Sequence, residues 1–190
     1  KKPLGNQFVG RSNAGLIEFN NHLYIYGGYT GANIQDFAKY NLSNNDLTKL
    51  EQMPTTTSNL KGKSTFRVGD FMYHFDVYGT GVSRYSLLSD TWEYNVVRMP
   101  QVAFTPESGF VIGSTVYLTT RNTASNAFWA FDTENLTWTQ KADYPDASGK
   151  RGTFAFTVNG KGYYGGGRNY QTNGCTDNAQ QPGCYFNYFY

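Results

Sequence analysis

Histidine and cysteine, the residue types that most often carry nucleophilic or metal chemistry, are scarce in this sequence. It contains two of each: His22, His74, Cys175 and Cys184. Nucleophilic triads need a histidine beside a hydroxyl or thiol, and metal sites need clustered ligands. His22 lies in or beside a turn and His74 alternates with aromatic residues, so we interpret both as strand-surface or packing residues. The sequence therefore predicts no catalytic residue, no metal site and no cofactor.

The two cysteines lie nine positions apart, in a polar segment that also contains glycine and proline. We interpret Cys175 and Cys184 as a structural disulfide, which would stabilise the fold by about 2–3 kcal/mol on a loop-entropy estimate. The alternative is a pair of reduced thiols in a cytosolic protein. A disulfide would favour an extracytoplasmic location, either secreted or at a cell surface.

Charge patterning argues against two broad classes of partner. The chain carries 16 basic and 14 acidic residues, a formal net charge of +2, with no long basic run. Such a balance does not favour binding to nucleic acid or to an anionic membrane surface. No apolar run approaches the roughly 18 residues that a membrane-spanning helix needs. We therefore predict neither a nucleic-acid partner nor a membrane span.

The elements that must position any site are β-strands. Aromatic residues make up 17% of the chain, with 16 Tyr and 14 Phe, and there are 21 Gly. Aromatic side chains favour pleated, half-buried surfaces, and glycine supplies the positive φ angles of tight turns. The composition predicts an all-β protein.

Three sequence positions recur with one period of 45 or 46 residues. A proline ends each unit, an apolar anchor precedes it by seven or eight residues, and an aromatic residue lies seven positions further upstream. These columns are Pro54, Pro100 and Pro145; Leu47, Trp92 and Trp138; and Tyr40, Tyr85 and Phe131. A regular period of this length indicates a repeat architecture.

Each unit also begins with two predicted strands joined by a short turn. The first strands are predicted at 14–19, 64–68, 108–112 and 153–158, and Tyr-containing strands at 23–26, 72–75, 116–118 and 162–164. The turns are Asn20-Asn21, Gly69-Asp70, Gly113-Ser114 and Asn159-Gly160, dipeptides that tolerate the positive φ of hairpin turns. Four antiparallel strands repeated in this way predict the blades of a β-propeller.

The order of a strand ending in Gly-Gly, then Tyr, Trp and Pro resembles the kelch motif, and the segment from Asp132 to Pro145 resembles kelch repeats of bacterial surface and secreted proteins. Leu47 replaces the tryptophan in the first unit, and the two middle units lack the double glycine. The resemblance implies that the Tyr and Trp columns pack between adjacent blades. It predicts an all-β kelch-type propeller of four four-stranded antiparallel blades, at approximately 10–54, 62–100, 107–145 and 151–190, with the last blade lacking its fourth strand.

Both ends of the chain lie inside a predicted blade. The segment 185–190 matches a third strand, and the segment from Lys1 to Leu4 resembles the end of a fourth strand. An open edge of aromatic strands would promote aggregation. We therefore expect the chain to be part of a longer protein or a larger ring, with its open strands or blades completed by the rest of the chain or by another subunit.

The kelch resemblance brings two kinds of enzyme into consideration. Copper-radical oxidases of this fold need two histidine ligands and a cysteine bonded to a tyrosine, whereas both cysteines here lie in one loop. We exclude that activity. A sugar-acting kelch enzyme of the sialic-acid-epimerase kind needs only a few Arg and Glu residues at the channel mouth and stays open, as does a cytosolic kelch substrate adaptor.

Propellers commonly bind their partners through loops on one rim. In this register the rim combines the loops between second and third strands with the segments that lead into each first strand. The predicted binding residues are Tyr29, Asn33, Arg121, Asn122, Arg151, Arg168, Asn169 and Tyr170, and Arg11, Lys61, Lys63, Glu107 and Lys150 lie in the lead-in segments. Aromatic, amide and guanidinium groups suit a glycan or a polar protein surface. We predict a non-catalytic binding or scaffold propeller that recognises a protein partner or a glycan.

Overall fold

The computed structural model describes residues 9–32, 34–52, 65–76, 81–100, 106–120, 127–143 and 150–169. Within these ranges, residues 107, 120, 150, 151, 168 and 169 are described through their backbone. All regular elements in these ranges are strands.

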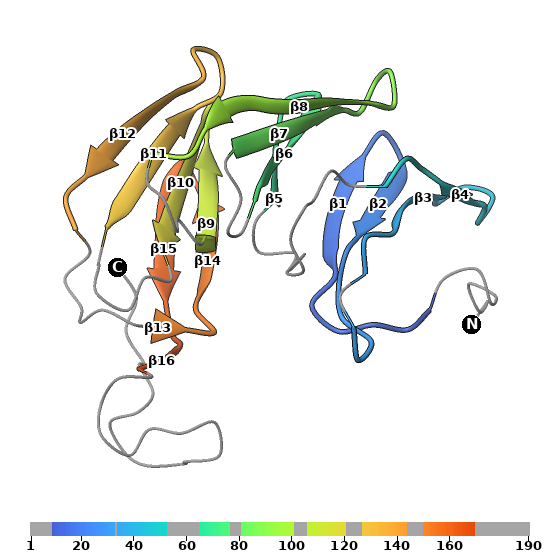
Figure 1. Cartoon of the computed structure of the whole chain (residues 1–190), viewed down its shortest axis with the longest axis horizontal. Helices are drawn as coiled ribbons and strands as arrows, with labels where there is room; N and C mark the ends of the chain where they lie inside the picture. Colours follow the sequence, from blue (N-terminus) through green and yellow to red (C-terminus); the bar gives the residue numbers. More distant parts are fainter. Residues whose placement is uncertain are drawn as a thin grey trace.

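Three four-stranded antiparallel sheets follow one another along the chain, and a hairpin follows them (Figure 1). The first sheet contains β1 (Gly15–Phe19), β2 (His22–Tyr26), β3 (Phe37–Asn41) and β4 (Leu47–Lys49). The second contains β5 (Thr65–Val68), β6 (Phe71–Phe75), β7 (Gly81–Ser86) and β8 (Thr91–Arg98). The third contains β9 (Pro106–Ile112), β10 (Thr115–Thr120), β11 (Phe128–Asp132) and β12 (Thr137–Lys141). The fourth, as far as it is described, contains β14 (Phe154–Val158) and β15 (Lys161–Gly165), preceded by β13 (Lys150–Arg151) and followed by β16 (Arg168–Asn169).

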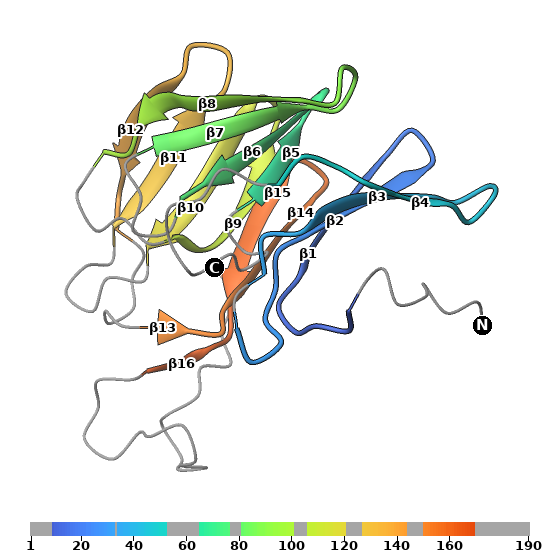
Figure 2. The same cartoon turned by 45° about the vertical axis from the view of Figure 1, so that its right-hand side comes forward.

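The sheets are arranged as successive blades of a propeller. The first strands of neighbouring sheets lie side by side: β1 contacts β5, β5 contacts β9, and β9 contacts β14. The remaining strands fan outward from them (Figures 1 and 2). The all-β propeller fold predicted from the sequence is confirmed, with three complete blades and a fourth of which the described residues form a hairpin.

The turns between third and fourth strands repeat one backbone conformation. One residue of this turn adopts positive φ in each complete sheet: Asn45 at 64°, Asp90 at 55° and Leu136 at 54°. In the first two sheets this residue also accepts a hydrogen bond from a tyrosine hydroxyl five positions upstream, Tyr40 to Asn45 at 2.6 Å and Tyr85 to Asp90 at 3.1 Å. Asn and Asp tolerate this left-handed conformation better than most residues, which explains the polar turns of the sequence.

The core lies between the sheets. One buried cluster joins the first two sheets and consists of Ile17, Phe19, Tyr24, Tyr26, Phe37, Met72, Tyr85, Leu87 and Trp92. A second joins the second and third sheets and consists of Tyr73, Phe75, Val82, Val116, Leu118, Ala127, Trp129 and Phe131. Edge-to-face pairs run through both clusters, including Phe37 against Tyr85 at 4.7 Å and Phe75 against Phe131 at 5.5 Å between ring centroids. Each such pair stabilises the fold by about 0.5–1.5 kcal/mol beyond the contribution of the apolar surface that it buries.

The second strand of each of the first two sheets sends a tyrosine hydroxyl to the following sheet. The hydroxyl of Tyr24 donates to the carbonyl of Leu87 at 3.4 Å, and that of Tyr73 donates to the carbonyl of Thr133 at 3.4 Å. Each acceptor follows directly after a third strand. The tyrosine column of the repeat therefore links a blade to the next one along the chain.

The tryptophans make the reciprocal link to the preceding sheet. Nε1 of Trp92 donates to the carbonyl of Glu51 at 3.3 Å, and Nε1 of Trp138 donates to the carbonyl of Arg98 at 3.1 Å. Each acceptor lies at or just beyond the end of a fourth strand. The expectation that the Tyr and Trp columns pack between adjacent blades is confirmed at both of these interfaces.

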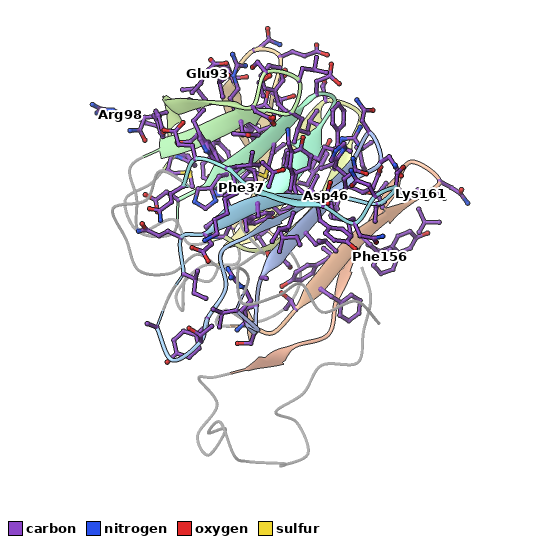
Figure 3. All side chains as sticks on the ribbon, turned by 90° about the vertical axis from the view of Figure 1, so that its right-hand side faces the viewer. Phe37, Asp46, Glu93, Arg98, Phe156 and Lys161 are labelled. Carbon is purple, nitrogen blue, oxygen red and sulfur yellow. The ribbon has the colours of Figure 1, made fainter. Side chains whose placement is uncertain are left out.

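The last sheet has one open face within the described residues. Phe154, Phe156 and Val158 are 42%, 42% and 46% exposed. Phe156 stacks on Phe154 at 6.2 Å and on Tyr163 at 5.4 Å between ring centroids. Figure 3 shows Phe156 at the surface of the β14–β15 hairpin.

Candidate binding rim

The hairpin turns and the longer loops lie at opposite ends of the sheets. In Figure 1 the β1–β2, β7–β8 and β11–β12 turns lie at the upper end, whereas β13, β16 and the segments flanking β1 and β2 lie at the lower end. The lower end is the rim on which the sequence places its candidate binding residues. The structure therefore brings together the two kinds of segment that the rim was predicted to combine.

Two short arms extend the β1–β2 and β14–β15 hairpins towards this rim. Ser12 pairs with Tyr29 three residues beyond the Gly15–Tyr26 pair of the first hairpin. Arg151 pairs with Arg168 three residues beyond the Phe154–Gly165 pair of the fourth. The first arm, Arg11, Ser12, Tyr29 and Thr30, and the fourth arm, Lys150, Arg151, Arg168 and Asn169, therefore occupy equivalent register positions.

The double glycine of the repeat creates the arms. Gly27 and Gly28 have φ of 59° and 108°, and Gly166 and Gly167 have φ of 65° and 89°. Only glycine adopts these angles without steric cost. A Cβ on Gly28 would also lie 2.9 Å from the carbonyl oxygen of Ser12. The backbone therefore leaves the sheet at the glycines and resumes pairing beyond them.

As far as it is described, the third sheet, which lacks the double glycine, continues its ladder where the first and fourth sheets leave theirs. Thr119 pairs with Ser108, and Thr120 then pairs with Pro106 across a register shift. A bulge of this type adds a residue to one strand while the ladder continues. Among the described residues, arms of this form are seen in the two blades whose sequence contains the double glycine.

Arg11 supports the first arm. Its guanidinium donates to the carbonyl of Gly27 at 3.1 Å and to Asp36 Oδ2 at 3.1 Å, and Nε donates to the carbonyl of Val9 at 3.0 Å. The side chain is 3% exposed. The predicted rim position of Arg11 is therefore used to hold the arm and the following loop together rather than to meet a ligand.

Tyr29 presents its side chain on the rim. Its backbone is held by both hydrogen bonds of the bridge, from Ser12 N to Tyr29 O at 3.0 Å and from Tyr29 N to Ser12 O at 2.9 Å. The residue is 48% exposed. A fixed backbone with an exposed aromatic ring suits stacking on a sugar or packing against a protein.

The fourth arm is a short two-stranded ladder rich in cations. Lys150 pairs with Asn169 and Arg151 pairs with Arg168. By register, Arg151 corresponds to Ser12 and Arg168 to Tyr29. Both corresponding residues of the first arm are exposed.

The base of the fourth arm is tied to the third sheet by hydroxyl groups. Thr153, between β13 and β14, is hydrogen-bonded through Oγ1 to Ser108 Oγ at 2.9 Å. Thr119 Oγ1 donates to the carbonyl of Ser108 at 3.1 Å. All three side chains are buried. These bonds fix the point from which the arm extends.

Several predicted residues lie outside the described ranges. They are Asn33, Arg121, Asn122, Tyr170, the cysteines Cys175 and Cys184, and the lysines Lys61 and Lys63. Their contribution to the rim stays a prediction, as does the disulfide.

Sequence reasoning did not find a buried polar cluster in the second sheet. Nδ1 of His74 lies 3.1 Å from Thr65 Oγ1. Ser83 lies opposite His74 on β7, as its Cα partner in the ladder. His74 is 2% exposed, and burial lowers its pKa from 6.5 to about 4. Its Nε2 has no hydrogen-bond partner within the described structure. A neutral, enclosed imidazole is a packing residue, as the sequence predicts, and only its contact with Thr65 required the structure.

His22 serves a local turn, with Nδ1 2.8 Å from the carbonyl oxygen of Asn20. Within the described residues no group of three or more His, Cys, Asp or Glu side chains could hold a metal ion. The same residues contain no helix long and apolar enough to cross a membrane.

The fold and the rim define a β-propeller with loop arms on one face. No protein-family model matches the chain, and no curated protein matches it. Among solved structures it is similar to the one described as "Structure of YjhT", with a TM-score of 0.70 and 16% sequence identity. The match covers 85% of this chain and 60% of the other, so the chain spans less than two thirds of that protein's length. At this identity the similarity shows a common fold.

Proposed function

We propose that this protein is a non-catalytic binding propeller that recognises a protein partner or a glycan through the rim carrying the two arms. The observation that carries the proposal is the shared register of the arms at one end of the sheets. Both arms depend on paired glycines with positive φ. A double glycine followed by a short paired arm occurs in two blades on one rim, and such an arrangement suits the presentation of side chains to a partner.

The residue types on the arms support recognition of a polar surface. Tyr29 offers an exposed aromatic ring, and Arg151 and Arg168 place two guanidinium-bearing residues on the equivalent arm. Tyrosine and arginine are enriched among the residues that dominate protein interfaces, and both also bind sugars. We further propose an extracytoplasmic location, at the cell surface or secreted.

The test measures binding by the wild type and by rim variants. A glycan array and a pull-down from the native membrane fraction identify a ligand, and titration then gives its affinity. We expect Tyr29→Ala and Arg168→Ala each to weaken binding about tenfold. Lys161→Ala, beside the β14–β15 turn at the opposite end of the hairpin, should leave the affinity unchanged.

Equal affinity in all variants would contradict the rim as the binding surface. Turnover of a sugar substrate that is lost in Arg151→Ala would instead indicate an enzyme. Location is tested separately by labelling thiols in the native protein: unreactive Cys175 and Cys184 that become reactive after reduction are expected outside the cytoplasm. Free thiols on both would favour the cytosolic adaptor.

A further inference from the structure

The fourth sheet leaves exposed the face that each earlier sheet packs against its successor. On this face Phe156 and Val158 are 42% and 46% exposed. Counted from the hairpin turns, they occupy the strand positions of Ile17 and Phe19 in the first sheet. Ile17 and Phe19 are buried in the cluster that joins the first two sheets. Arrays of repeats usually end in a polar outer face, so an apolar terminal face indicates a surface that is covered in an assembly.

The first sheet is open on its other face. Leu16 is 61% exposed, and Leu23 is half-buried. They occupy the positions of Thr65 and Met72 in the second sheet, which are 6% and 0% exposed where that sheet covers the first. The first sheet therefore presents the kind of face that covers a preceding sheet.

The open face of the fourth sheet also has the aromatic content of the covered face of the first. In the first sheet Tyr26 is the cross-strand partner of Gly15, and in the fourth Phe154 is the cross-strand partner of Gly165, at the same register position. Each face thus contains one aromatic ring and one glycine at this pair, on opposite strands. The ring of Phe154 stacks on that of Phe156 at 6.2 Å between centroids, so both belong to the open face.

A hydrogen-bond donor of the repeat lies on the same open face. Tyr163 is the cross-strand partner of Phe156 and occupies the position of Tyr24 and Tyr73. The hydroxyls of Tyr24 and Tyr73 each donate to a backbone carbonyl of the following sheet at 3.4 Å. The fourth sheet therefore offers the donor of one more bond between sheets.

The matching acceptor lies on the first sheet. Leu42 occupies the position of Leu87 and Thr133, whose carbonyls accept the two tyrosine hydroxyls. In all three sheets the backbone N–H of this residue donates to the turn between the first and second strands, at 2.9–3.1 Å. Leu42 is 42% exposed. The chain thus contains both halves of one further interface, on faces that do not meet within it.

We propose that a second copy of this chain covers these faces, with the fourth sheet of one copy packed on the first sheet of the other. At the interface between the second and third sheets, the ring of Phe66 lies 2.9 Å from the Cβ position of Gly109. Phe156 and Leu16 occupy these two positions on the open faces. Phe156 therefore meets Leu16 of the second copy. Head-to-tail contacts of this kind can close two copies into a ring.

The contact between copies is weaker than the interfaces within the chain. Leu47 stands where Trp92 and Trp138 donate a hydrogen bond to the preceding sheet, so the contact lacks one of its two reciprocal bonds. Association is therefore reversible. The inference concerns assembly and does not depend on the ligand of the rim, although the contact sets the fourth arm of one copy beside the first arm of the other.

The experiment measures the mass of the full chain by analytical ultracentrifugation. We expect monomers at about 1 µM and mainly dimers at about 200 µM. Phe156→Asp and Leu16→Asp each place a charge in the apolar contact and should weaken association at least tenfold. The control is Leu88→Asp in the β7–β8 turn, where the side chain is 68% exposed and lies on neither face, and its dimer should match the wild type within about twofold.

Mixing the two disruptive variants tests the head-to-tail arrangement. Phe156→Asp retains an unaltered first sheet and Leu16→Asp an unaltered fourth sheet, so the mixture contains one intact contact. We expect a heterodimer that is weaker than the wild-type dimer but tighter than either variant alone. If a face paired with its own copy, one of the two variants would dimerise as well as the wild type by itself. That result would overturn the proposal.

A milder variant and a stability measurement separate assembly from folding. Tyr163→Phe removes only the hydroxyl and should weaken the dimer about threefold. At about 1 µM, where the copies are separate, all variants should unfold at the wild-type temperature, because the altered side chains are then at the surface. A wild-type chain that stays monomeric at about 200 µM would overturn the proposal. So would a dimer that Phe156→Asp and Leu16→Asp leave intact.

Discussion

The interface between the second and third sheets and the open face of the fourth sheet both contain phenylalanine at the same strand position, but the ring is packed in the first and exposed in the second. Phe66, Phe110 and Phe156 occupy the same position of the first strand in three successive blades. Phe66 packs against the second core cluster, whereas Phe156 is 42% exposed. The strand and its register are alike in both places, so the presence of a covering sheet decides the burial.

A blade of this protein therefore has apolar side chains on both faces, and each face needs a neighbouring sheet to cover it. In the interior, each face is closed by a buried aromatic cluster and by reciprocal Tyr and Trp hydrogen bonds. A single four-stranded blade is too thin to bury both of its faces, so stability accrues from each interface that stacking creates. Perturbations at a closed interface should therefore cost far more than the same perturbations on the open face.

The largest difference is expected from matched Phe→Ala substitutions. Phe131 is fully buried, 4.8 Å from Trp138 and 5.5 Å from Phe75 between ring centroids. Phe131→Ala should lower the free energy of unfolding by about 3–5 kcal/mol, and Phe156→Ala by less than about 1 kcal/mol. Urea denaturation measures both. Equal losses would show that the open face is covered in solution.

A pH titration tests the closed interface between the first two sheets through His74. Burial lowers its folded-state pKa to about 4 from 6.5, so the unfolded chain binds a proton that the folded chain does not. The free energy of unfolding should therefore decrease as the pH falls from about 6.5 to 4, by up to about 3 kcal/mol. In His74→Gln this part of the pH dependence should disappear.

The control for His74 is His22→Gln, because that ring lies at the surface beside Asn20. Stability curves measured at several pH values should fall in parallel for His22→Gln and wild type. A parallel fall for His74→Gln as well would mean that another group carries the effect.

A smaller effect is expected where the third and fourth sheets meet. A Cβ on Gly162 would lie 2.0 Å from a ring carbon of Phe110, so Gly162→Ala forces the ring aside. We expect a loss of about 1–3 kcal/mol in the free energy of unfolding. Combining it with Phe110→Ala should cost less than the sum of the two single changes, since the clash is then removed. Additive losses would contradict direct packing of Gly162 on this ring.

The smallest effect is expected from the ion pair that joins the first two sheets. Lys39 bonds to Asp90, and their side chains are 25% and 33% exposed. Because solvent screens a pair of this kind, Lys39→Met should cost about 1 kcal/mol or less. The loss should shrink in 1 M salt, where the Debye length is about 3 Å. An undiminished loss would indicate that the aliphatic stem of Lys39, rather than its charge, stabilises the interface.

Much of the fold could be predicted from the sequence because its information is local and periodic. Strand alternation, turn dipeptides and the recurrence of Trp92 and Trp138 each depend on a few neighbouring residues. Asn45 and Asp90 of the third-to-fourth turns adopt positive φ, as turn formers of this kind do, whereas the third turn places Leu136 there. The structure adds the partners of the two tryptophans, the carbonyls of Glu51 and Arg98, because these contacts span about one whole repeat.

The candidate site was predictable only in outline. The rim could be predicted, since loop residues at equivalent places in each blade must lie at one end of the sheets. The different roles of Arg11 and Arg151 could not, because both are cations in lead-in segments. Only the tertiary structure shows that Arg11 is held by an ion pair with Asp36, while Arg151 lies opposite Arg168 in a ladder. No local pattern distinguishes these partners, which come from different segments of the chain.

The sequence by itself therefore determined the repeat, the strand order within each blade and the all-β propeller class, because hydrophobic alternation and turn chemistry act over a few residues. The tertiary structure decided which faces are closed, how the double glycines carry two arms beyond their sheets, and which cations oppose each other there. These features depend on register and on the stacking of whole sheets, and register is set by contacts between strands rather than by any strand alone.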